Sequence, residues 1–203
     1  MHRPQVDTAL LDGLRAQARF LGASATGLLP ATRVRVEERF ARMCAVPTPC
    51  PSYGLAPGCP PHAMSPEAFK LYLQDFQTAL VFKIDAPVED LLGPKRLDLA
   101  RAIHRIAATL EHSALSRGMA KAQGMAAGSC KELFCAQEQA CAVLAHKRPC
   151  RSPDLARPSL SAVGVDFSAL AALLNWPFGK LAATTVGGEP AMGLMAGLVL
   201  LGR

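Results

Sequence analysis

Segments with helical hydrophobic spacing alternate along the chain with segments that have strand-like spacing. Apolar residues recur every three or four positions over 6–21 and 94–117, which predicts two amphipathic helices. A third helix is predicted over 65–76, because Ser65 can cap it and Pro66 suits its first position. Two shorter helical segments are predicted over 36–43 and 166–174.

Four other segments are predicted to be strands, and the one over 78–84 has the apolar, β-branched character of a buried strand. They cover residues 26–29, 78–84, 119–125 and 192–201. A further strand over 182–186 is predicted to pair with 192–201 as a hairpin that closes the sheet. The apolar run at 192–202 falls short of the ~20 residues that a membrane-spanning helix needs, so we interpret it as a strand.

These elements predict an α/β (α+β) fold, in which helices and a small mixed sheet form a single sandwich. We expect one domain over residues 1–203, with two Pro- and Gly-rich cysteine loops over 44–65 and 128–160.

The composition excludes several classes of protein. Half of the 203 residues are hydrophobic and 19% are charged, unlike a disordered chain or a coiled coil. The net charge is +6, but the basic residues are scattered and do not alternate with aromatic residues, so we expect no nucleic-acid partner. Residues 1–12 lack the apolar region of a signal peptide, so we expect a cytoplasmic protein with no membrane partner.

The seven cysteines are the strongest chemical signal. The first loop contains Cys44, Cys50 and Cys59, and the second contains Cys130, Cys135, Cys141 and Cys150. Thiols stay reduced in the cytoplasm, and an odd number cannot all pair. The cysteines therefore indicate a metal or redox site rather than a disulfide framework.

The spacing of the cysteines favours an iron–sulfur centre, with one or two [4Fe–4S] clusters. Cluster ligands converge from an irregular backbone, which Gly and Pro provide, and ferredoxin-type sites show a related Cys-Pro ending. Structural zinc sites commonly use close cysteine pairs, and no Cys-x2-Cys pair occurs here. Zinc and redox-inert buried cysteines stay as alternatives.

Five polar side chains are further candidates. His62 is a possible fourth ligand for the first loop or a solvent-facing residue. Tyr53 can hydrogen-bond a cluster sulfur or pack the loop. Arg151 and Arg157 can offset a cluster's negative charge, bind an anionic partner or be solvated, whereas His104 is interpreted as structural.

Several motifs in the cysteine loops resemble those of a known family. They are Cys50-Pro-x-Tyr53-Gly54-x4-Cys59-Pro60-Pro61, Gly128-Ser129-Cys130 and Ala156-Arg157-Pro158-Ser159. They are similar to those of the cysteine-rich prokaryotic family of predicted metal-binding proteins, a domain of unknown function. The resemblance covers nearly the whole chain. It implies a cytoplasmic α/β protein that carries iron–sulfur clusters, and it supplies no established reaction.

Two functions of different class are consistent with these residues. The first is an accessory redox protein that passes electrons to a partner protein. The second is a metalloenzyme that uses an open iron of a three-cysteine cluster. A zinc-stabilised interaction protein is a third possibility. The absence of a flavin motif, a nucleotide motif or an acid/base pair favours the accessory role, and the oligomeric state stays open.

Overall fold

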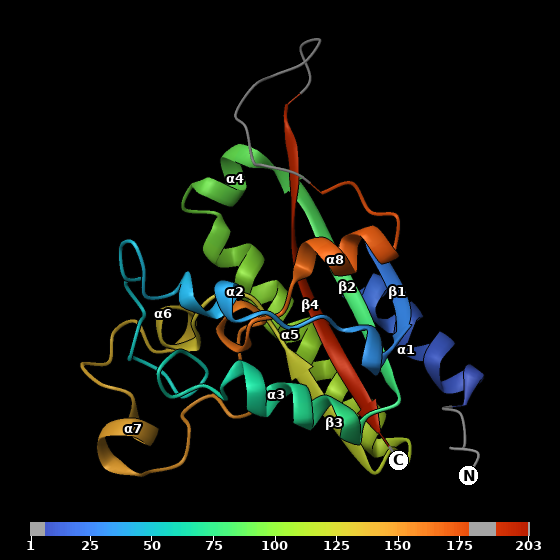
Figure 1. Ribbon diagram of the computed structural model, residues 1–203, viewed down its shortest axis with the longest axis horizontal. Helices are drawn as coiled ribbons and strands as arrows, with labels where there is room; N and C mark the ends of the chain where they lie inside the picture. The colour runs from blue at the N-terminus through green and yellow to red at the C-terminus, as the bar shows by residue number, and fades with distance from the viewer. Residues whose placement is uncertain (1–6, 179–189, 203) are drawn as a thin grey trace.

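The computed structural model describes residues 7–178 and 190–202, which form a four-stranded sheet flanked by helices (Figure 1). The sheet has the order β1-β2-β4-β3. Its strands are β1 (Ala25–Pro30), β2 (Thr78–Pro87), β3 (Lys121–Met125) and β4 (Met192–Gly202). The predicted α+β class is confirmed. The sequence indicated a mixed sheet, but the described strands all pair in antiparallel fashion. The strand predicted over 182–186 lies outside the described residues.

The helices predicted from hydrophobic spacing are present. They are α1 (Thr8–Phe20), α2 (Glu38–Arg42), α3 (Pro66–Tyr72), α5 (Arg96–Ser116) and α8 (Phe167–Leu173). Ser65 caps α3 by accepting a hydrogen bond from the Ala68 N–H, and Asp166 caps α8 in the same way from Ala169. No helix in the described part of the chain is long and apolar enough to cross a membrane.

Three short helices were not predicted. These are α4 (Val88–Leu92), α6 (Cys130–Phe134) and α7 (Ala142–His146). Both α6 and α7 interrupt the second cysteine loop, so that loop is less irregular than the sequence suggested. Residues 44–65 contain no helix or strand, as expected from their Pro and Gly content.

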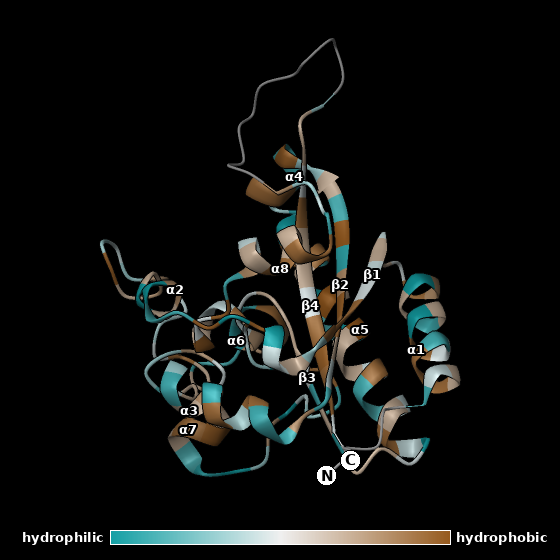
Figure 2. Ribbon diagram, turned by 45° about the vertical axis from the view of Figure 1, so that its right-hand side comes forward, coloured by the Kyte–Doolittle hydropathy of each residue, from teal (hydrophilic) through white to brown (hydrophobic). Residues whose placement is uncertain are grey.

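The sheet is buried on both faces because its side chains alternate between two apolar layers. Leu80 and Phe82 of β2 pack on the side of α1 and α5, and Ala79 and Val81 pack on the side of α3 and α8. The central strand β4 is therefore an unbroken apolar run, which passes through the middle of the molecule (Figure 2).

The cysteine loops lie together at one side of this sandwich, at the left of Figure 1. After β3 the chain forms a bridge between Ala126 and Ser159. Backbone hydrogen bonds of 2.8 and 2.9 Å join Ala126 to Pro158 and Leu160. The bridge ties the start and the end of the second loop to the edge of the sheet.

We predict that Phe82→Ala lowers the free energy of unfolding by about 3–5 kcal/mol. Phe82 is 0% exposed, and its ring fills the space over Gly197, where an added Cβ would lie 2.5 Å from Phe82 Cζ. Urea denaturation measures the change. Phe20→Ala is the matched control, because Phe20 is 90% exposed and its removal leaves no cavity. Equal losses in the two variants would contradict this core.

Candidate metal centre

The first loop follows the end of α2 and contains three cysteines. Cys44 is half-buried, Cys50 is exposed and Cys59 is buried. The Cys50 N–H donates to the Cys44 carbonyl at 2.9 Å, which closes a turn between these two residues. The Cys59 N–H donates to the Ala56 carbonyl at 3.0 Å. The loop is therefore held by turns of its own backbone.

The second loop places its four cysteines at the ends of the short helices. Cys130 begins α6, Cys135 follows it, Cys141 precedes α7, and Cys150 lies beyond α7. All four are half-buried. Lys131 Nζ donates to the carbonyls of Cys135 and Glu138 at 2.8 and 2.7 Å, and so orders the chain between the two helices.

The two loops meet at Cys59. Its Sγ lies 3.3 Å from Ser129 Oγ in a buried hydrogen bond, and Ser129 directly precedes Cys130. The loops also lie on either side of a small cavity of about 360 Å³, which is lined by His62 of the first loop and Cys141 of the second. The two cysteine groups are thus neighbours in space, although 70 residues separate Cys59 from Ser129.

Burial and mutual repulsion make it unfavourable for several of these thiols to ionise. The pKa of Cys130 is raised to about 12, first by burial and then by the charges of Cys59 and the other cysteines of its loop. Burial also raises the pKa of Cys44, Cys59 and Cys135. Bringing a cation among these thiols would favour the thiolate form and release protons.

The donor chemistry fits a thiolate-bound metal. All seven cysteines are free of disulfide bonds, and thiolates are the ligands of iron–sulfur clusters and of structural zinc. Across residues 7–178 and 190–202, no group of three or more His, Cys, Asp or Glu side chains is arranged to hold a metal ion. The residues present therefore fit a thiolate-bound metal in the chemistry of their donor atoms and in the closeness of the two loops. The described side chains do not form a ligand shell in advance.

The structure changes the interpretation of some polar candidates. His62 is exposed, which matches the solvent-facing alternative, and it lines the cavity that Cys141 also lines. Arg151 is exposed and forms an ion pair with Glu138 at 3.0 Å. Tyr53 lies at the surface.

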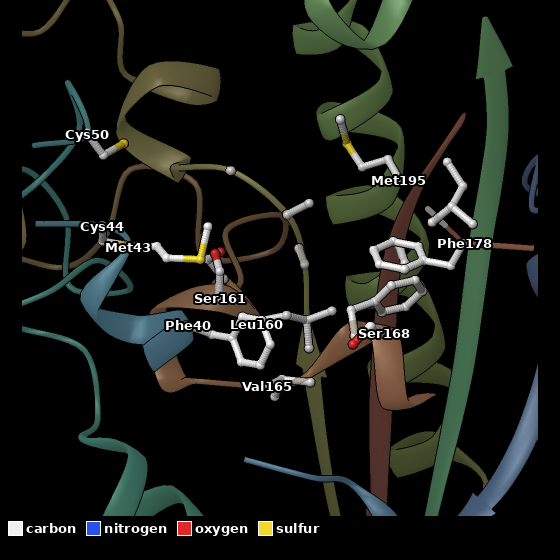
Figure 3. A pocket seen from close by; sticks show the side chains of 17 residues that line it. Phe40, Met43, Cys44, Cys50, Leu160, Ser161, Val165, Ser168, Phe178 and Met195 are labelled. Carbon is white, nitrogen blue, oxygen red and sulfur yellow. The ribbon is translucent and has the colours of Figure 1, made fainter. Parts of the chain in front are cut away.

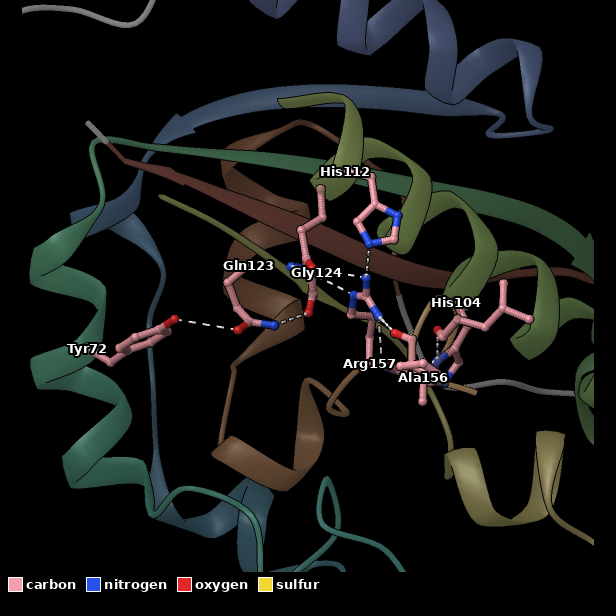
Figure 4. A network of polar contacts seen from close by, with 10 residues as sticks. Tyr72, His104, His112, Gln123, Gly124, Ala156 and Arg157 are labelled. Carbon is pink, nitrogen blue, oxygen red and sulfur yellow. Dashed lines mark hydrogen bonds and ion pairs between the residues drawn. The ribbon is translucent and has the colours of Figure 1, made fainter. Parts of the chain in front are cut away.

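Arg157 is neither a surface residue nor a candidate for anion binding, because it is buried and fully engaged. Its guanidinium forms two parallel contacts with Glu111 of α5, at 2.9 and 3.0 Å. It also donates to the Pro153 and Ala156 carbonyls at 3.0 and 2.8 Å. Figure 4 shows this group at the centre of a polar network that extends to Tyr72. The interaction fastens the end of the second cysteine loop to α5.

His104 of α5 has the structural role that the sequence indicated. Its side chain is fully buried, and Nδ1 accepts a hydrogen bond from the Arg157 N–H at 3.1 Å. Its ring packs edge-on against Phe134 of α6, with the centroids 5.3 Å apart. Burial lowers the pKa of His104 to about 4. The neutral ring therefore holds both ends of the second loop on α5.

An open cavity of about 580 Å³ lies beside the first cysteine group (Figure 3). Cys44 and Cys50 lie at one end of it, and Phe178 and Met195 lie at the other. No motif in the sequence indicated this cavity. Its lining comes from segments that are distant in the chain, so no local pattern could have indicated it.

Two residues that hold the loops in place were not among the candidates expected from the sequence. Ser129 contacts Cys59, and Glu111 pairs with Arg157. The position of Ser129 before a short helix was a local signal of a cap, although its side chain makes no capping hydrogen bond. Nothing in the sequence singled out Glu111, because its partner lies 46 residues away.

Comparison with known proteins gave one family. The family described as "Predicted metal-binding protein (DUF2284)" matches residues 27–201, a span that includes all seven cysteines. No curated protein and no solved structure gave a significant match.

We predict that the folded state loses stability as the pH falls from 6.5 towards 4. The unfolded chain binds a proton at His104 below about pH 6.5, whereas the folded chain binds it only near pH 4. The difference corresponds to about 3 kcal/mol of stability, which is present above pH 6.5 and lost through this window. Urea denaturation at several pH values measures the slope.

The variant His104→Asn removes the titrating ring and should flatten this part of the pH dependence. His146→Gln is the matched control, because it also removes one histidine but at an exposed position, and it should leave the slope unchanged. An unchanged slope in His104→Asn would show that the dependence arises elsewhere.

Proposed function

We propose that this chain, which belongs to the DUF2284 family of predicted metal-binding proteins, is a cytoplasmic iron–sulfur protein that passes electrons to a partner enzyme. The main support is the meeting of the two cysteine loops at Cys59 and Ser129. It gathers seven unpaired thiols at one side of the sheet, including cysteines that are far apart in the sequence. Seven free thiols in two neighbouring loops suit soft, thiolate-bound iron better than a structural disulfide set.

In this proposal, the second loop alone supplies all the protein ligands of one cluster. Its four cysteines are Cys130, Cys135, Cys141 and Cys150, and four thiolates suffice for a [4Fe–4S] cluster. The first loop contributes Cys44, Cys50 and Cys59, one ligand fewer than a closed site uses. Because Cys59 lies next to the second group, an arrangement with one shared cluster is the competing possibility.

A bound cluster would supply reversible one-electron transfer, and residues of this chain would tune it. The Ser152 N–H lies 3.4 Å from Cys150 Sγ, and the Ser129 hydroxyl lies beside Cys59 Sγ. Hydrogen bonds of this kind stabilise thiolate charge and raise a cluster's reduction potential. Burial raises the pKa of Cys135, and the positive charge of Lys131 partly offsets this effect.

The redox partner is assigned to the face that carries the second loop. His146, Lys147 and Arg148 are exposed between Cys141 and Cys150. A basic surface next to the metal ligands favours association with an acidic surface of the partner protein.

The cavity beside Cys44 and Cys50 favours a second candidate function. A three-cysteine cluster leaves one iron without a cysteine ligand, and small-molecule sites are concave and mostly apolar. The alternative is therefore a metalloenzyme in which the first loop's centre faces a substrate cavity. Reversible reduction without turnover would favour the electron carrier over this enzyme.

We predict that Cys135→Ala lowers bound iron by about four atoms per chain in protein purified anaerobically, because one [4Fe–4S] cluster is lost. Iron and sulfide assays with the absorbance near ~400 nm measure the loss. His62→Ala is the matched control in the neighbouring loop, and it should keep the iron content of the unmodified protein.

Unchanged iron in Cys135→Ala would contradict the assignment of the second loop. About four irons per unmodified chain, instead of about seven or eight, would contradict two separate sites. A colourless protein that contains zinc and no sulfide would support the zinc-stabilised alternative.

We predict that removal of the metal makes the cysteine loops sensitive to proteases while the sandwich stays folded. Residues 44–65 lack regular structure, so metal ligation should provide much of their order. The two apolar layers around the sheet contain none of the seven cysteines, so they should persist without the metal. Limited proteolysis followed by mass spectrometry locates the cuts with and without iron. Identical cleavage in both states would contradict the coupling of metal binding and order.

A further inference from the structure

We propose that the cavity beside Cys44 and Cys50 binds a neutral, mainly apolar small molecule, whose polar end faces these two cysteines. The inference rests on the proposed function, because it assigns a class of ligand to the metal site that the cysteines of the first loop are proposed to form. The cavity of about 580 Å³ lies within the range of ~300–1,000 Å³ that is typical of small-molecule sites.

The walls of the cavity are apolar and come from several elements. Phe40 of α2 and Phe167 of α8 contribute aromatic rings, and Leu194 and Met195 of β4 contribute aliphatic surface. Figure 3 shows these elements around the cavity, with α2 and α8 on either side. A concave lining made by separate elements is typical of a site for a small molecule rather than for the flat surface of a partner protein.

The charges around the cavity select a neutral ligand. Apart from Cys44 and Cys50, which would be thiolates around a bound cluster, the described residues that line it carry no ionisable side chain. Asp166, which accepts a hydrogen bond from the lining residue Ser168, is already opposed by Arg35 and Arg39 at 3.9 Å. A nucleotide or another anion would lose its hydration without gaining a counter-charge, which is unfavourable in an apolar site.

The hydroxyl groups set the orientation of the ligand. Ser159 and Ser161 lie 3.0 Å apart, and the Ser161 side chain also hydrogen-bonds the Cys44 thiol. At the other end, the Ser168 hydroxyl is directed to Asp166. Three polar side chains, Ser159, Ser161 and Cys44, thus gather at the cysteine end, and the apolar part of a ligand would lie towards Phe178 and Met195.

A competition assay with the iron-loaded, full-length protein tests the ligand class. Nile red, a neutral fluorophore, serves as the probe, and n-alkanols from butanol to octanol displace it. We expect each added methylene to strengthen displacement about fourfold until the cavity is filled, as expected for burial of a CH₂ group. Hexanoate should compete much more weakly than hexanol. Equal competition by hexanoate, or no dependence on chain length, would overturn the proposal.

A pair of tryptophan variants locates the binding. Leu194→Trp narrows the apolar end and should weaken Nile red binding about tenfold or more without changing the iron content. Met192→Trp is the matched control, because Met192 is an exposed residue of the same strand and is not part of the lining. If Leu194→Trp does not fold, Ser168→Trp narrows the same end from α8. Unchanged binding in the narrowed variant would overturn the site.

The electron-resonance signal of the iron-loaded protein tests the orientation. Octanol should change this signal in the unmodified protein and leave it unchanged in Leu194→Trp. Binding of octanol without any change in the signal would overturn the contact with the cysteine end. If Leu194→Trp changes the sedimentation coefficient but leaves probe binding unchanged, the cavity is an interface between copies of the chain and the proposal fails.

These outcomes separate the inference from the proposed function. Iron-loaded protein that binds no probe disproves the cavity ligand and leaves the iron–sulfur assignment intact. Protein that binds the probe with the expected selectivity but never binds iron supports the ligand class and disproves the iron–sulfur function.

Discussion

The ion pair between the buried Arg157 and Glu111 holds the cysteine-rich side of the molecule in place. It docks the end of the second cysteine loop onto α5, and His104 adds a hydrogen bond to the Arg157 backbone. Such a pair is stable only when the remaining donors are satisfied, and here they bind carbonyls of the same loop. Because Ser159 follows two residues later, the same interaction also positions the bridge to β3 and the polar end of the cavity.

The molecule divides its stability between two regions with different physical origins. The sheet is stabilised by apolar layers on both faces, which need no ligand. The cysteine loops contribute few apolar contacts, and burial disfavours the charge of their thiols. Metal binding is therefore a natural source of order for the loops, whereas the sandwich provides a fixed support for them.

Local patterns in the sequence were sufficient for most of the secondary structure. Helix α5 was predicted over 94–117 and observed over Arg96–Ser116, because its apolar stripe repeats at the helical period. The start of α3 followed from the capping residue Ser65 and the adjacent Pro66. The short helices α6 and α7 were missed, because each has a single turn and no hydrophobic period long enough to detect.

The sequence by itself determined the class of fold, the soft donor chemistry of seven thiols and the division of those thiols between two loops. Only the tertiary structure decided that β4 lies at the centre of the sheet, that Cys59 adjoins the second loop, and that a cavity opens beside Cys44. The reason is that hydrophobic periodicity and turn residues act over a few positions along the chain. Strand order, the contact between Cys59 and Ser129 and the lining of a cavity depend instead on the packing of segments tens of residues apart.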